Sequence, residues 1–268
     1  MQDLRVSLVQ AATRWHDLPG NHALYGDLVR PLRGHTDLVV LPETFTSGFT
    51  NDTLHQAESR DGKTLPWLAV LAAEVQAVVT GSVVMREGDR VFNRLLWMRP
   101  DGSHAEYDKR HLFRMAGEHQ RYSAGRQRLI VTLAGWRVCP LICYDLRFPV
   151  WSRNRFGDNG TEGFDYDLLL FVANWPSPRR EHWRSLLRAR AIENLAYVAA
   201  VNRVGSDGNG LHYAGDSVVI DPLGAASLEC GDQEQVVTVR LSAERLQAHR
   251  ERFPAWMDAD EFSLRGPE

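Results

Sequence analysis

Residues 138–149 read VCPLICYDLRFP, an apolar run that breaks abruptly into polar and aromatic residues. The apolar part is typical of a buried strand. Cys143 stands at the break, where a strand would end and a turn begin, so its side chain would lie at the rim of a sheet within reach of a substrate. We therefore predict that Cys143 is a nucleophile. The competing interpretation, a cysteine that packs as a small apolar residue, is the one we favour for the preceding Cys139.

Composition limits the class of protein. The chain has 268 residues, of which 44% are apolar and 24% charged, as is usual for a soluble globular protein. The formal charge of −3 gives no basic field for nucleic acid, so no nucleic-acid partner is expected. No apolar stretch approaches the roughly 18 residues of a membrane span, and no secretory signal is visible, so no membrane partner is expected either. The three cysteines lack paired spacing, which indicates reduced thiols and a cytoplasmic location.

Short apolar runs and turn signals predict the strands, and apolar spacing predicts the helices. We expect strands at 4–11, 37–42, 78–85, 91–99, 128–133, 136–142, 167–172, 197–201, 214–220 and 236–241. We expect helices at 21–32, 64–77, 180–196 and 242–252. Because strands alternate with helices early and late, with hairpins between them, the pattern predicts an α/β chain of layered mixed sheets. We find no linker or repeat, and we expect one domain over residues 1–268 with the last ~25 residues as a C-terminal tail.

A thiol needs a base, or a lowered pKa, to attack at neutral pH. Histidine is the familiar partner, and ten histidines keep that option open, although none lies in a local signature beside an orienting Asn or Asp. Two other residues form a stronger pattern with Cys143. Glu43 follows the strand at 37–42, and Lys109 opens a polar connection at 108–125, a length that is usually functional. Of 31 basic residues only Lys63 and Lys109 are lysine, which favours a site that needs a compact ammonium group, although Lys63 has the sequence surroundings of an exposed loop residue. Taken singly, Glu43 could instead cap a helix or face solvent, and Lys109 could belong to a solvated loop.

Three blocks of the sequence resemble those of the nitrilase superfamily of carbon–nitrogen hydrolases, in the same order and at similar separations. The blocks are Leu41-Pro42-Glu43 with Phe45, residues 107–113 (YDKRHLF) and residues 141–149 (LICYDLRFP). The resemblance runs from the first strand to about residue 240. It implies a four-layer α-β-β-α sandwich and the pairing of two chains as a homodimer. It also implies a cofactor-free enzyme, and since no His or Cys set has metal-ligand spacing, we expect no metal.

The resemblance implies a Glu-Lys-Cys triad. Glu43 would be the general base, and Cys143 would form a thioester. Lys109 would hold the oxyanion together with the backbone N–H of Tyr144, and its charge would lower the pKa of the thiol. Glu118 would orient Lys109 or the leaving group. The alternative interpretation of Glu118 is a structural carboxylate at the start of a helix.

Residues 111–119 (HLFRMAGEH) and Asn174-Trp175-Pro176 are similar to the omega-amidase branch. That similarity implies hydrolysis of the terminal amide of a short dicarboxylic acid monoamide, such as 2-oxoglutaramate or succinamate. A bidentate arginine is the natural partner of the free carboxylate in such a substrate. The candidates, among which sequence does not choose, are Arg114, Arg121 and Arg147. The residues expected to line the pocket and limit its length are Phe113, Tyr144 and Trp175.

Other interpretations stay open at this point. The same triad could act on a nitrile, a carbamoyl compound or another small aliphatic amide. The chain could also be a non-catalytic binding or scaffold protein that kept the fold, although an intact Glu, Lys and Cys argue against that. Asp145 and Arg147 could be structural, pairing with each other to hold the turn that presents Cys143.

Overall fold

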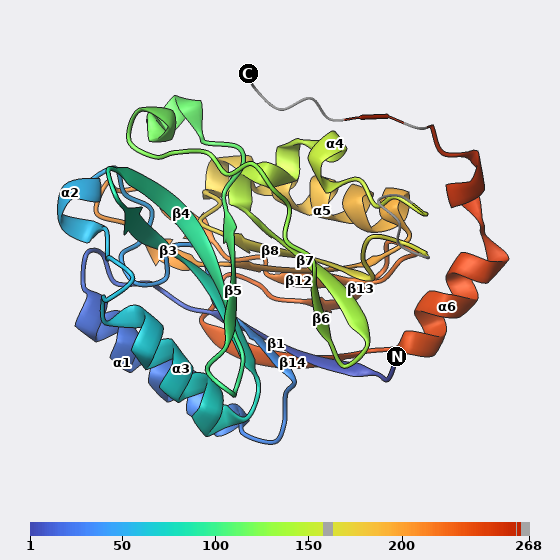
Figure 1. Ribbon diagram of the computed structural model, residues 1–268, viewed down its shortest axis with the longest axis horizontal. Coiled ribbons are helices and arrows are strands. Elements are labelled where there is room, and N and C mark those ends of the chain that lie inside the picture. The colour runs from blue at the N-terminus through green and yellow to red at the C-terminus, as the bar shows by residue number, and fades with distance from the viewer. Residues whose placement is uncertain (158–162, 261, 264–268) are drawn as a thin grey trace.

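The computed structural model describes residues 1–157, 163–260 and 262–263. Two six-stranded mixed sheets pack face to face at its centre (Figure 1). The first sheet, in spatial order, is β14 (Gln235–Leu241), β1 (Leu4–Gln10), β2 (Leu38–Val40), β3 (Val78–Glu87), β4 (Arg90–Met98) and β5 (His104–Asp108). The second is β13 (Ala226–Glu229), β12 (Val218–Ile220), β9 (Tyr197–Asn202), β8 (Leu168–Ala173), β7 (Trp136–Ile142) and β6 (Val131–Leu133).

Side chains of the first sheet alternate between two cores, because successive residues of a strand point to opposite faces. In β2, Leu38 and Val40 pack in the core between the two sheets. Val39, between them, packs instead against the outer helices. The strand is therefore apolar on both faces, which is the sequence pattern of a sheet covered on both sides.

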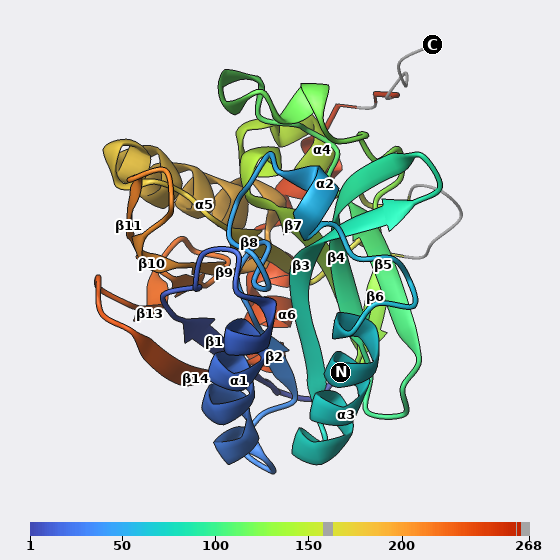
Figure 2. The same cartoon turned by 90° about the vertical axis from the view of Figure 1, so that its left-hand side faces the viewer.

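Helices form the two outer layers, as Figure 2 shows in a second view. The first sheet is covered by α1 (Leu18–Val29) and α3 (Thr64–Val75). The second is covered by α5 (Arg180–Asn194), which packs Trp183, Leu187 and Ala191 against it. These layers confirm the predicted four-layer α-β-β-α sandwich.

The strand directions bring several strand ends to one edge of the molecule. β1, β2 and β3 run parallel, and β5 points the same way because β3–β4 and β4–β5 are antiparallel pairs. β7, β8 and β9 are likewise parallel. The carboxyl ends of parallel strands are where open sheets place their ligands.

Several predicted elements differ in their bounds. The strand expected at 214–220 is two strands, β11 (His212–Ala214) and β12. Gly215 and Asp216 have φ values of 66° and 57°, a left-handed conformation that interrupts a strand. β11 pairs instead with β10 (Val204–Ser206) in a separate hairpin. The helix expected from Asn21 begins earlier, because Asp17 accepts a hydrogen bond from Gly20 N and caps it.

Short elements complete the chain. They are α2 (Thr53–Gln56), α4 (Pro149–Ser152), α6 (Ala243–Arg252) and the 3-10 turns η1 (Arg30–Leu32), η2 (Arg114–Ala116), η3 (Glu118–Gln120), η4 (Cys143–Arg147), η5 (Ser177–Arg179) and η6 (Ala255–Asp258). Part of the expected C-terminal tail lies outside the described residues. Within the described ranges, no helix combines the length and apolar character that a membrane crossing requires.

Candidate active site

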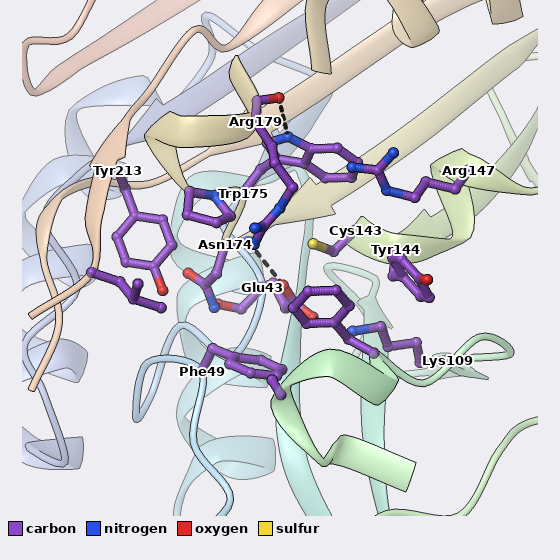
Figure 3. A pocket seen from close by; sticks show the side chains of 14 residues that line it. Glu43, Phe49, Lys109, Cys143, Tyr144, Arg147, Asn174, Trp175, Arg179 and Tyr213 are labelled. Atoms are coloured by element: carbon purple, nitrogen blue, oxygen red, sulfur yellow. Dashed lines mark hydrogen bonds and ion pairs between the residues drawn. The ribbon is translucent and has the colours of Figure 1, made fainter. Parts of the chain in front are cut away.

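Strand ends from both sheets meet at one small pocket (Figure 3). Glu43 follows β2 and Lys109 follows β5, both in the first sheet. Cys143 follows β7 and Asn174 follows β8, both in the second. The cavity volume is about 50 Å³, which is room for a few water molecules.

Cys143 lies at a sharp turn between β7 and η4. Its φ is 44°, a left-handed value that is uncommon for a residue with a side chain and that clusters at functional sites. The turn is held by the buried carboxylate of Asp145, which accepts hydrogen bonds from Ile142 N at 3.1 Å and Tyr107 Oη at 2.7 Å. His111 donates two more to the same carboxylate, from its backbone N at 2.9 Å and with Nδ1 at 2.8 Å.

Asp145 does not pair with Arg147, as one interpretation of the sequence had it. Arg147 instead places its guanidinium 3.0 Å from His182 Nδ1 and over the ring of Trp175. The reason is direction: Asp145 faces the core between the sheets, whereas Arg147 faces the pocket.

Glu43 is fully buried and fixed from three sides. Its Oε1 accepts hydrogen bonds from Lys109 Nζ at 2.9 Å and from Asn93 Nδ2 at 2.8 Å. Its Oε2 accepts one from the backbone N of Asn174 at 2.8 Å. The Asn174 side chain also donates to Glu43 O and to Thr44 Oγ1. The carboxylate therefore has a single orientation, aimed at the pocket.

Lys109 bridges two carboxylates. Its Nζ lies 3.0 Å from both oxygens of Glu118, in addition to its bond with Glu43. Burial alone would lower the pKa of Lys109, but the charges of Glu118 and Glu43 outweigh burial and hold that pKa well above its ordinary value. Burial also raises the pKa of Glu118, with the Lys109 charge acting against it. The ammonium group is therefore charged across the physiological range.

The Cys143 thiol is protonated at rest. Burial raises its pKa well above the ordinary value, and the neighbouring Glu43 carboxylate raises it further. The charge of Lys109 lowers the pKa of the thiol, as the sequence led us to expect, but this effect is smaller than those of burial and of the Glu43 charge. Glu43 lines the same pocket as Cys143, which makes its carboxylate the candidate base for the thiol proton.

Aromatic rings and two arginines form the wall of the pocket. Of the residues expected there, Phe113, Tyr144, Arg147 and Trp175 all line it. Further lining residues that the sequence did not point to are Phe49, Arg179, Leu211 and Tyr213. Arg114 and Arg121 are exposed and do not line the pocket, so the structure does not bring these two candidates to the site.

Three residues around the site had no role assigned from sequence. Asn174 was quoted only as part of a motif, and Arg179 follows that motif closely, so the motif was the available signal. Asn93 interrupts the apolar pattern of β4, and a buried amide in a strand signals a specific partner. In the part of the chain that the structure describes, no group of three or more His, Cys, Asp or Glu side chains is arranged to hold a metal ion.

Comparison with known proteins identifies close relatives. The sequence profile of the carbon–nitrogen hydrolase family matches residues 5–251. Omega-amidase YafV of Escherichia coli K12 is 48% identical over 266 residues, which cover 98% of this chain and 100% of that protein. The 2-oxoglutaramate amidase of Bacillus subtilis is 37% identical over 227 residues, covering 84% of this chain and 85% of that protein.

A solved structure agrees with the fold. XC1258 from Xanthomonas campestris is a CN-hydrolase superfamily protein with an arsenic adduct in its active site. It superposes with a TM-score of 0.97 at 60% identity, covering 99% of this chain and 100% of that one. The resemblance seen in the three sequence blocks is confirmed, which sets aside the non-catalytic alternative. The chain is a hydrolase of carbon–nitrogen bonds other than peptide bonds, and it belongs to the carbon–nitrogen hydrolase family of the nitrilase superfamily.

Proposed function

We propose that this enzyme hydrolyses the terminal amide of a short dicarboxylic acid monoamide of the 2-oxoglutaramate or succinamate type. The observation that carries the proposal is the pocket: Glu43, Lys109 and Cys143 line it together with Arg147. Its relatives support the same chemistry, since one is named an omega-amidase and another a 2-oxoglutaramate amidase.

Acylation begins at the thiol. Cys143 Sγ attacks the carbonyl carbon of the amide while Glu43 accepts the thiol proton. Lys109 Nζ and the backbone N–H of Tyr144 stabilise the oxyanion that forms. When the tetrahedral intermediate collapses, the carbon–nitrogen bond breaks, Glu43 returns the proton to the leaving nitrogen, and ammonia departs from a thioester on Cys143.

Deacylation reuses the same groups. Glu43 takes a proton from a water molecule, whose oxygen attacks the thioester carbon. The same donors hold the second oxyanion, and the carbon–sulfur bond then breaks as Glu43 reprotonates the sulfur. Glu118 orients Lys109 in both steps, because its two oxygens hold Nζ at 3.0 Å.

Arg147 anchors the free carboxylate at the far end of the substrate. Its guanidinium is spread over the Trp175 ring, with Cζ 4.8 Å from the ring centroid. None of the described residues pairs a carboxylate with Arg147, so its fork is available to a substrate. Phe113, Tyr144 and Trp175 limit the length of the chain between the amide and the carboxylate.

Ammonia release from a small substrate panel tests this proposal. Succinamate and 2-oxoglutaramate are compared with simple nitriles and with short neutral amides. We expect the two monoamides to be hydrolysed best, and the Cys143→Ala variant to release no ammonia. Mass spectrometry of a quenched reaction should find the acyl group on Cys143.

Two results would contradict it at different levels. Hydrolysis of nitriles or neutral amides without hydrolysis of the monoamides would refute the substrate class. Full activity of Cys143→Ala would refute the mechanism itself.

A further inference from the structure

Two neighbouring arginines, Arg179 and Arg180, have opposite surroundings. Arg180 binds the buried carboxylate of Asp216 through Nε at 2.6 Å and Nη2 at 2.7 Å. Arg179 lines the pocket and has no carboxylate partner among the described residues. The half-buried guanidinium of Arg179 therefore lies at the wall of the pocket with no carboxylate beside it in the described part of the chain.

The backbone and the side chain of Arg179 are both held in place. Its N donates to Pro176 O at 3.0 Å, and its O accepts from Trp175 Nε1 at 2.7 Å. Its guanidinium lies over the ring of Phe113, with Cζ 5.2 Å from the ring centroid. Phe113 is in turn tied to the site, because its N donates to Glu118 Oε2 at 2.6 Å.

Arg147 and Arg179 reach the pocket from different elements, the turn η4 and the turn η5 (Figure 3). Each stacks on an aromatic ring of the lining, Trp175 and Phe113 respectively. The other charged lining residues, Glu43 and Lys109, are bound to each other. The unpaired charge of the described lining is therefore two cations.

We propose that Arg179 is a second substrate-binding arginine, which with Arg147 selects a substrate whose far end is anionic and carries no ammonium group. This inference rests on the proposed function and deepens it, because it names the residue that separates succinamate from asparagine. Asparagine is succinamate with an ammonium group added beside the carboxylate. Two fixed guanidinium groups attract the carboxylate of both compounds but repel the added cation, which a low-dielectric pocket screens poorly.

The test measures binding apart from turnover. Calorimetry on the Cys143→Ala protein gives the affinities for succinamate, asparagine and neutral butanamide. The same titrations are made with Arg179→Gln and Arg179→Lys in that background. Arg114→Gln is the matched control, since Arg114 is an exposed arginine one residue from Phe113 and outside the pocket lining.

We expect Arg179→Gln to weaken succinamate binding about 10- to 100-fold, as loss of a charged hydrogen bond does. The preference for succinamate over butanamide and over asparagine should fall with it. Arg179→Lys keeps the charge but loses the forked guanidinium, so its affinity for succinamate should lie between those of the parent and of Arg179→Gln. This variant keeps the test informative if Arg179→Gln does not fold. Arg114→Gln should bind like its parent.

Three contrary results distinguish a failure of the inference about Arg179 from a failure of the proposed function. If the Cys143→Ala parent binds succinamate but Arg179→Gln keeps both preferences, the inference about Arg179 is wrong and the proposed function stands. An equal loss of succinamate affinity in Arg114→Gln would also overturn the inference, because it would show that affinity follows the net charge of the protein and not a contact with Arg179. If the parent binds neither succinamate nor 2-oxoglutaramate, the proposed function fails and the inference fails with it.

Discussion

The neighbours of Cys143 make its thiol less acidic, not more. Burial and the Glu43 carboxylate hold the thiol pKa well above its ordinary value. At neutral pH the sulfur is therefore protonated, and in the proposed mechanism its attack depends on transfer of the proton to Glu43. The buried ammonium of Lys109 keeps that carboxylate hydrogen-bonded in place.

Glu43→Gln should change turnover and thiol acidity in opposite directions. The amide keeps the shape of the side chain but cannot act as a base, so kcat on succinamate should fall about 10²- to 10⁴-fold. Removing the negative charge also removes one cause of the raised pKa of Cys143. The pH at which iodoacetamide begins to alkylate Cys143 should therefore move down. An unchanged alkylation profile would show that Glu43 does not act on the thiol.

Asp145 ties the segment of Lys109 to the turn of Cys143. Its carboxylate binds Tyr107 and His111, which lie on either side of Lys109, and also Ile142, which precedes Cys143. Asp145→Asn would turn an NH₂ group toward these donors, at a cost of about 1–3 kcal/mol in unfolding free energy. We expect kcat to fall as well, because the two catalytic segments lose their common anchor.

Tyr107→Phe is the control for Asp145→Asn, since it removes one of these hydrogen bonds and leaves the carboxylate. Urea unfolding and steady-state kinetics on both variants check the prediction. A wild-type kcat in Asp145→Asn would show that the network serves stability alone.

Sequence alone identified the three residues that the pocket brings together, because each lies within a short local block. It did not assign roles to Asn93 or Asn174, whose partners lie far away along the chain. Arg179 was missed for the same reason, since only the folded chain shows that Arg180 is paired with Asp216 whereas Arg179 has no carboxylate partner among the described residues.

At the scale of elements, β3 packs tightly beneath the segment that carries Glu43. A Cβ on Gly81 would lie 2.8 Å from Phe45 Cδ1 and 2.9 Å from Leu41 Cβ, closer than real contacts allow. Gly81→Ala should cost about 1–3 kcal/mol in unfolding free energy and lower kcat, because residues 41–45 must move and Glu43 moves with them.

Gly231→Ala is the matched control, because a Cβ there meets no atom within 4 Å. It should stay within about 0.5 kcal/mol of wild type. Chemical unfolding and kcat measured on both variants give the comparison. A destabilised Gly81→Ala protein with normal kcat would show that the strand does not set the position of Glu43.

Most elements were predictable because their apolar pattern is strong. The exceptions have weak patterns for physical reasons. β5, with the sequence HAEYD, is an edge strand whose outer face is polar, and it was not predicted as a strand. β10 and β11 are three residues each and pair only with each other, so neither leaves a periodic signal.

At the scale of the whole molecule, the last described helix joins the two sheets. β14 belongs to the first sheet, and α6 follows it along the chain. From α6, Arg250 binds Asp167 at 2.6 Å and Tyr166 O at 2.9 Å, next to β8 of the second sheet. Burial alone would raise the pKa of Asp167, but hydrogen bonds and charges from Arg137 and Arg250 hold it below its ordinary value.

Arg250→Met should therefore destabilise the protein in a pH-dependent way. A lowered carboxyl pKa stabilises the fold above the ordinary value near 4, and that stabilisation is lost as the pH falls. We expect a loss of about 1–3 kcal/mol at pH 7. The difference between variant and wild type should narrow below about pH 4. Urea unfolding at several pH values checks this, with the exposed Arg252→Met on the same helix as control.

A constant difference across that pH range would show that Arg250 contributes through packing alone. The layered architecture was predictable from the family resemblance, whereas this cross-connection was not, because an arginine in a charged helix gives no sign of its partner. The homodimer implied by that resemblance stays a prediction, which sedimentation velocity would check.

The division of the pocket between two sheets has a consequence for how activity arises during folding. Glu43 and Lys109 come from the first sheet, whereas Cys143 and Asn174 come from the second. In the proposed mechanism, a chain whose sheets have not docked holds the Cys143 thiol without the base Glu43 and without the oxyanion donor Lys109. Such a chain is not expected to form a thioester on Cys143 from an amide. Catalytic activity therefore requires that the two sheets have docked. The turnover number of a preparation then reports the fraction of its molecules that are fully folded.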